Sequence, residues 1–180
     1  MRILKEQAAG LVIDIQERLF PFIYENDALT RNASILVQGL QVLGIPVIVT
    51  EQYSKGLGPT ITPLKEVLGS IQPLEKMAFS CCDDQPFMQM FHSLHKKFVI
   101  ITGIESHVCV LQTTIDLLEK NYIPVVVEDC VSSRKLNDKI MAINRMRRMG
   151  AIITTYESVL FELLRYSGTD EFRAISRLVK

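Results

Sequence analysis

Short apolar runs of strand length alternate along this chain with longer segments of helical period. The apolar runs are Ala9–Ile15, Pro46–Thr50, Phe98–Thr102, Pro124–Glu128 and Ala151–Thr154. Strands that are apolar nearly throughout, rather than at every second residue, are typical of a sheet covered on both faces. The alternation therefore predicts an α/β fold: a single three-layer α/β/α domain over residues 1–180, with a mainly parallel sheet.

The segments between these runs predict the helices. Apolar side chains in them recur every three or four residues, over Leu29–Leu43, Gln85–Lys96, Val108–Lys120, Lys135–Met149, Ser158–Tyr166 and Asp170–Val179. Asp84 is expected to cap the helix that follows it. The stretch Glu51–Pro63 holds two glycines and two prolines and predicts a long loop, which in a compact domain is often functional.

Charge and cysteine content exclude several classes of function. Lys plus Arg and Asp plus Glu number 20 each, so no net field attracts nucleic acid or an acidic membrane surface. The apolar run Ala8–Ile13 is too short for a signal peptide, and no run approaches the length of a membrane span. The four cysteines show neither CxxC nor zinc-finger spacing. We therefore expect a cytoplasmic protein with a small-molecule substrate and no nucleic-acid or membrane partner.

Polar residues follow several of the predicted strands, where ligands bind in open parallel sheets. Asp14 lies between two isoleucines, where a carboxylate is costly unless it is paired. It could cap the turn after the strand, or it could accept a proton from a nearby nucleophile. Lys76 interrupts a partly apolar segment, and it is either a solvated surface group or a buried cation that holds such a carboxylate.

Cys109 lies at the start of the predicted helix Val108–Lys120, which follows the predicted strand Phe98–Thr102. Unpaired N–H groups at a helix N-terminus favour a thiolate, so this position predicts a nucleophilic cysteine with a pKa below the free value of roughly 8.5. The alternative is a small buried side chain that only packs, as most free cysteines do.

Three ordered segments resemble motifs of the isochorismatase-like cysteine hydrolase superfamily. They are Asp14-Ile15-Gln16, Lys76 within EKMAFS, and Gly103–Val110, and the resemblance runs from about Ala8 to Tyr156. The stretch Val49–Ile61 further resembles the isochorismatase domain-containing subgroup. The resemblance implies an α/β fold with a mainly parallel, Rossmann-like six-stranded sheet, and a catalytic triad of Asp14, Lys76 and Cys109. It also implies a cis peptide bond between Ile104 and Glu105, and an oxyanion hole made by the N–H groups of Glu105 and Cys109.

Substrate contacts are expected from side chains near these motifs: Gln16, Phe20, Tyr53, Phe79, Ser106 and the loop Gly56–Thr60. Nicotinamidases, which belong to the same superfamily, hold a metal with an Asp-x-His motif. The corresponding stretch here reads Glu51-Gln52-Tyr53, and His92, His95 and His107 lie elsewhere. We therefore predict neither a metal nor a cofactor, and we disfavour nicotinamide as the substrate.

The resemblance implies a hydrolase that cleaves a C–N bond of a small amide or carbamoyl compound. Three alternatives stay open: hydrolysis of an isochorismate-type enol ether, a non-catalytic binding or assembly module on the same fold, and a redox thiol protein that uses Cys81 and Cys82. The superfamily commonly forms oligomers, so we also expect a homo-oligomer. The Met-rich helix Lys135–Met149 could supply the contact surface or could pack only in the core.

Overall fold

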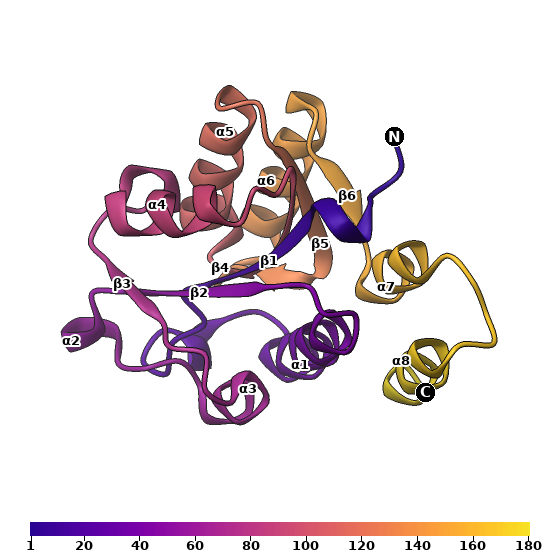
Figure 1. Cartoon of the computed structure of the whole chain (residues 1–180). Helices are drawn as coiled ribbons and strands as arrows, with labels where there is room; N and C mark the ends of the chain where they lie inside the picture. The colour runs from indigo at the N-terminus through magenta and orange to yellow at the C-terminus, as the bar shows by residue number, and fades with distance from the viewer.

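Six parallel strands form the centre of the computed structural model, which describes residues Met1–Lys180 (Figure 1). They are β1 (Ala8–Ile13), β2 (Val47–Gln52), β3 (Leu74–Lys76), β4 (Phe98–Ile104), β5 (Ile123–Ser132) and β6 (Ile152–Thr154). Their order is β3-β2-β1-β4-β5-β6, and every neighbouring pair is parallel. The predicted fold class is confirmed. The strand order reverses between β1 and β4, which is where such sheets bind ligands.

Helices cover both faces of this sheet (Figure 1). One face carries α4 (Gln85–Ser93), α5 (Leu111–Glu119) and α6 (Leu136–Met149). The other carries α1 (Asn26–Val42), α3 (Thr62–Leu68) and α7 (Tyr156–Leu164), and α8 (Asp170–Leu178) packs on α1 and α7. The short helix α2 (Ser54–Leu57) follows β2. None of the helices combines the length and the apolar composition needed to cross a bilayer.

The core lies in layers between the sheet and these helices. Strands β1 and β4 are buried at every residue, as expected for the central strands of a doubly covered sheet. Buried side chains between the sheet and α4, α5 and α6 include Leu11, Val99, Ile101, Phe87, Phe91 and Met146. Those on the opposite face include Leu36, Leu40, Ile100, Val125 and Leu160 near α1 and α7, and Val12, Val49, Ala33 and Leu64 near α1 and α3.

Gly103 allows β4 to approach β1 closely. A Cβ atom at this position would lie 2.5 Å from the carbonyl oxygen of Ile13, and the backbone φ of +152° also disfavours other residues. The end of β4, which leads toward Cys109, therefore lies directly beside the residue that precedes Asp14.

Several predicted boundaries were wrong, for local physical reasons. Strand β1 ends at Ile13 rather than Ile15, because Asp14 turns the chain with a φ of +52°. The predicted loop Glu51–Pro63 contains the end of β2 and the helix α2. The pattern also missed α3 and β3, since β3 has only three residues and two of them are charged.

Candidate active site

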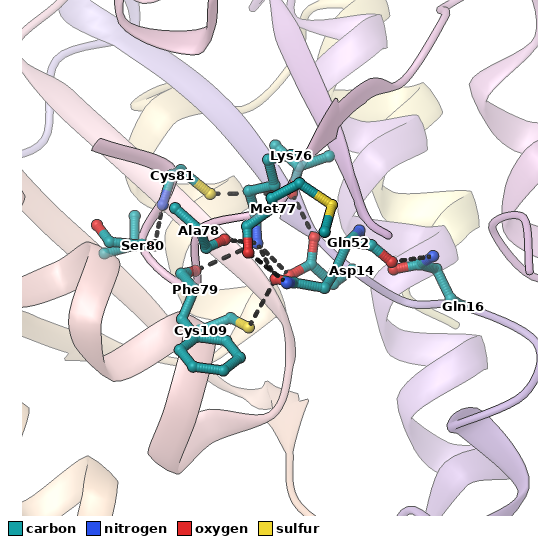
Figure 2. Close-up of polar contacts among 12 residues, drawn as sticks. Asp14, Gln16, Gln52, Lys76, Met77, Ala78, Phe79, Ser80, Cys81 and Cys109 are labelled. Atoms are coloured by element: carbon teal, nitrogen blue, oxygen red, sulfur yellow. Dashed lines mark hydrogen bonds and ion pairs between the residues drawn. The ribbon is translucent and has the colours of Figure 1, made fainter. Parts of the chain in front are cut away.

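An ion pair between Asp14 and Lys76 lies at the carboxyl edge of the sheet (Figure 2). Asp14 follows β1 and Lys76 ends β3, and the Lys76 Nζ is 2.6 Å from Oδ2 of Asp14. Both side chains are almost completely buried, with relative exposures of 0% for Lys76 and 3% for Asp14. The hydroxyl of Thr50 on β2 donates to Oδ1 of the same carboxylate at 2.8 Å. Each oxygen of Asp14 therefore has a partner, as a buried carboxylate requires.

Besides Asp14, three other groups contact the Lys76 ammonium. Its Nζ donates to Oε1 of Gln52 at 2.9 Å and lies 3.1 Å and 3.2 Å from the carbonyl oxygens of Ala78 and Phe79. Burial lowers the pKa of Lys76, but Asp14 and the nearby thiols favour the charged form, and the net effect raises the pKa. Lys76 is therefore a fixed positive charge, and Figure 2 shows these partners gathered around it.

Cys109 lies beside this ion pair, within the π-helical turn Ser106–Val110 that precedes α5. Its Sγ is 3.9 Å from Oε1 of Gln52, and the residue is 7% exposed. The predicted position at a strand-to-helix junction is confirmed. Asp14, Lys76 and Cys109, which are far apart in the sequence, thus lie together at one edge of the sheet (Figure 2).

The predicted fall in the pKa of Cys109 was wrong. Burial and the Asp14 carboxylate raise the pKa of this thiol well above its ordinary value, although the Lys76 ammonium acts in the opposite direction. Loss of solvation is the largest cause of this rise, and the negative charge of Asp14 is the next. Both favour the protonated thiol, so a nucleophilic role would need a base to accept its proton.

This raised pKa predicts an unusual pH dependence of alkylation. The rate at which iodoacetamide labels Cys109 should still increase near about pH 10, where a free cysteine with a pKa of roughly 8.5 has levelled off. Mass spectrometry of the Cys109 peptide across a pH series measures the rate, and Cys109→Ala identifies the peptide. A plateau below the free-cysteine midpoint would contradict the predicted protonation state.

The loop before Cys109 offers a free backbone donor. The peptide bond between Ile104 and Glu105 is cis. The N–H of Glu105 takes part in no hydrogen bond, while its carboxylate accepts from the backbone N and from Nε of Arg134, at 3.1 Å and 3.0 Å. Ser106 is completely buried, and its Oγ has no hydrogen-bond partner. The loop is therefore fixed through the Glu105 side chain, and the Glu105 N–H remains available.

The side chains expected to bind substrate fall into two groups. Tyr53 and Phe79 are about half exposed, at 48% and 54%. Gln16 is buried and bonds only within the chain: its amide group donates to the carbonyl oxygens of Gln52 and Gly58 and accepts from the N–H of Gln52. Phe20 packs against the apolar cluster below α1 and α3. Gln16 therefore holds the backbone of Gln52 in place, and Phe20 lies at the edge of the core.

Two site residues were missed by the sequence analysis as contributors to the site. Gln52 bonds both to Lys76 and to the Cys109 thiol, and its Nε2 donates to the carbonyl oxygen of Met77 at 2.8 Å. Thr50 holds Asp14. Both lie at the end of β2, between the strands that carry Asp14 and Lys76. The position of Gln52 after a strand was a usable signal, whereas Thr50 resembles any β-branched strand residue.

A groove of about 510 Å³ adjoins the ion pair on the β3 side. It is lined by Tyr53, Lys55, Glu75, Lys76, Met77, Ala78, Asp83 and Asp84. Cys109 is not among these residues, so the groove marks the approach to Lys76 rather than a pocket around the sulfur.

None of the three histidines forms a hydrogen bond with Asp14, Lys76 or Cys109. His107 Nδ1 is 3.0 Å from Oγ of Ser133, and His92 Nδ1 is 2.7 Å from the hydroxyl of Tyr122. The chain contains no group of three or more histidine, cysteine or acidic side chains arranged to hold a metal ion.

Comparison with known proteins gives a consistent result. The family model described as "Isochorismatase domain" matches residues 8–158. Isochorismatase family protein 1B of Dictyostelium discoideum is 36% identical over 99% of this chain and 89% of its own length. The secreted isochorismatase effector Isc1 of Phytophthora sojae is 34% identical over 99% and 87%. A solved structure named MAR1 ribonuclease from Caenorhabditis elegans is 38% identical, covers 99% of this chain and 92% of its own, and has a TM-score of 0.94.

Proposed function

The chain belongs to the isochorismatase family, and on this basis we propose that it is a hydrolase that cleaves a C–N bond of a small amide or carbamoyl compound. Cys109 is the proposed nucleophile, Asp14 the base and Lys76 the fixed cation. The observation that carries the proposal is the buried Asp14–Lys76 pair beside the Cys109 thiol. A scaffold has no need of a buried ion pair beside a thiol, and such pairs are weak evidence for stability.

The proposed reaction begins with transfer of the Cys109 proton to Asp14. As the proton leaves, the sulfur attacks the carbonyl carbon and a C–S bond forms. The carbonyl oxygen becomes an oxyanion, which the N–H groups of Glu105 and Cys109 stabilise. The C–N bond breaks as the nitrogen takes the proton from Asp14, and a thioester remains.

Water completes the proposed reaction. Asp14 accepts a proton from the water as it attacks the thioester, and the C–S bond then breaks to release the acid product. The proton returns from Asp14 to the sulfur. Lys76 keeps its charge throughout and holds the Asp14 carboxylate in place. No step uses a metal ion or a cofactor.

A substrate panel tests this function. Purified protein is incubated with primary amides, carbamoyl compounds, isochorismate and single-stranded RNA, and Cys109→Ala serves as the matched blank. Release of ammonia or amine that requires Cys109 is the expected result. RNA is included because the C. elegans relative is named a ribonuclease. Cleavage of RNA or isochorismate with no amide turnover would overturn the proposal.

We also propose that the chain forms a homo-oligomer through α6. Met146 packs in the core, but Leu136, Ile140, Met141 and Met149 on the same helix are exposed. Exposed apolar side chains on a surface helix can form an interface between chains. Static light scattering at micromolar concentration should give at least twice the mass of one chain, and Met141→Asp should lower it. A monomer at that concentration would contradict the proposal.

We propose a cytoplasmic location, because all four cysteines are free thiols. The Phytophthora sojae relative is named as secreted, so the location needs a direct measurement. Fractionation of cells that express the chain should place it with cytoplasmic markers, and recovery mainly from the medium would contradict this location.

A further inference from the structure

We infer that the site accepts an uncharged substrate with an apolar substituent and excludes carboxylates. The inference rests on the proposed function, which it narrows to one substrate class. It follows from three features near the thiol: acceptors already saturate the Lys76 ammonium, the charged side chains of the adjoining groove are mainly negative, and the exposed side chains on the loop after β3 are apolar.

Lys76 has no donor left for a substrate. Its ammonium carries three hydrogens, and four acceptors already lie within 3.2 Å of Nζ. The residue is 1% exposed, and the charge of Asp14 neutralises its own. An anionic substrate therefore gains little from Lys76, even though this cation lies beside the nucleophile.

The remaining charges near the ion pair are mainly negative. The adjoining groove carries Glu75, Asp83 and Asp84 against a single cation other than Lys76, which is Lys55. Like charges brought together cost several kcal/mol, so an approaching carboxylate is disfavoured.

The loop after β3 presents apolar side chains beside the site. Its backbone is held to the site at three successive carbonyls, since Gln52 donates to Met77, and Lys76 contacts those of Ala78 and Phe79. The side chains of Met77 and Phe79 are nevertheless 68% and 54% exposed. Figure 2 shows this loop curving past Lys76 and Cys109. A rigid backbone with exposed apolar side chains is suited to pack against an apolar group of a ligand.

Two thiol reagents of nearly equal size test the charge preference. Iodoacetamide is neutral and iodoacetate carries a carboxylate, and both alkylate the same sulfur. The rate ratio for Cys109 is divided by the ratio for glutathione at the same pH, which removes the intrinsic difference between the reagents. We expect Cys109 to favour iodoacetamide by roughly tenfold or more beyond glutathione.

Variants of Phe79 provide the matched controls. Phe79→Lys adds a cation beside the thiol and should move the ratio back toward that of glutathione, whereas Phe79→Gln removes the ring without adding charge and should leave the ratio high. N-benzyl iodoacetamide should label the wild type faster than iodoacetamide does, relative to glutathione, and Phe79→Gln should reduce that advantage.

Equal or faster labelling by iodoacetate would overturn the inference. Alkylation requires no turnover, so this result is separate from the substrate panel. Amide hydrolysis with no preference between the reagents would leave the proposed function intact and remove only the narrower claim. A strong preference without any hydrolysis would remove the proposed function instead.

Discussion

Replacing Lys76 with methionine is expected to destabilise the folded chain by about 3 to 5 kcal/mol and to abolish most turnover. Methionine fills a similar volume, but it leaves the Asp14 carboxylate buried without its cation. It also removes the group that fixes Gln52 and the carbonyl oxygens of Ala78 and Phe79. Urea unfolding followed by circular dichroism measures the loss of stability.

A double-mutant cycle measures the interaction free energy between Asp14 and Lys76 in the folded chain. Asp14→Asn alone leaves a buried ammonium, whereas Asp14→Asn with Lys76→Met leaves no charge. The double variant should therefore be more stable than the sum of the two single changes indicates. Additive losses would show that the two groups do not interact in the folded chain.

The stability difference between wild type and Lys76→Met should also depend on pH. Because the pKa of Lys76 is raised in the folded chain, its contribution is complete below the unfolded value of about 10.4 and is lost as the pH rises through the folded value. Above this point both proteins hold Asp14 beside a neutral side chain. The difference in unfolding free energy should therefore narrow at high pH, and a constant difference would contradict the assignment of a charged Lys76.

Cys109→Ala should reduce turnover by roughly 10⁴-fold or more, the scale expected when a covalent nucleophile is removed. Cys81→Ala is the matched control, because Cys81 is a second buried thiol near the same ion pair. Its Sγ lies 3.8 Å from the Thr50 hydroxyl, it is completely buried, and burial raises its pKa to about 11. A thiol without exposed surface cannot meet a substrate, so Cys81→Ala should retain most activity.

The steady-state rates of these two variants and of Asp14→Asn distinguish the remaining mechanisms. Loss of turnover in Cys81→Ala with activity kept in Cys109→Ala would show that the nucleophile is misassigned. Activity lost in Asp14→Asn but kept in Cys109→Ala would favour hydrolysis of an enol ether, which depends on the acid more than on the thiol.

The parts of this fold that could be predicted were those with a strong periodic signal. The five apolar runs correspond to β1, β2, β4, β5 and β6. Asp84 caps α4, as predicted, by accepting a 2.9 Å hydrogen bond from the N–H of Phe87. Strand β3 escaped prediction because three residues, two of them charged, carry no period. It is a strand because β2 pairs with it, which is a tertiary effect.

The candidate site, like the fold, could be predicted only in part. Motif order was enough to select Asp14, Lys76 and Cys109, which lie together at the sheet edge. The direction of the Cys109 pKa shift was predicted wrongly, since local position indicated a helix terminus but not the burial or the distance to Asp14. Gln52 lies two residues after the predicted strand Pro46–Thr50, but its bonds to Lys76 and Cys109 depend on a side-chain orientation that the sequence does not encode locally.

Strand β3 lies at one edge of the sheet, and its last side chain passes β2 to reach Asp14 beyond β1. A three-residue edge strand would ordinarily open locally at little free-energy cost. Here such an opening would also expose or separate a buried ion pair, so amide hydrogen exchange in β3 should be slow for so short a strand. By holding β3 against β2, the same pair keeps the edge of β2 covered from other chains, and Lys76→Met should therefore also make the protein more prone to aggregate.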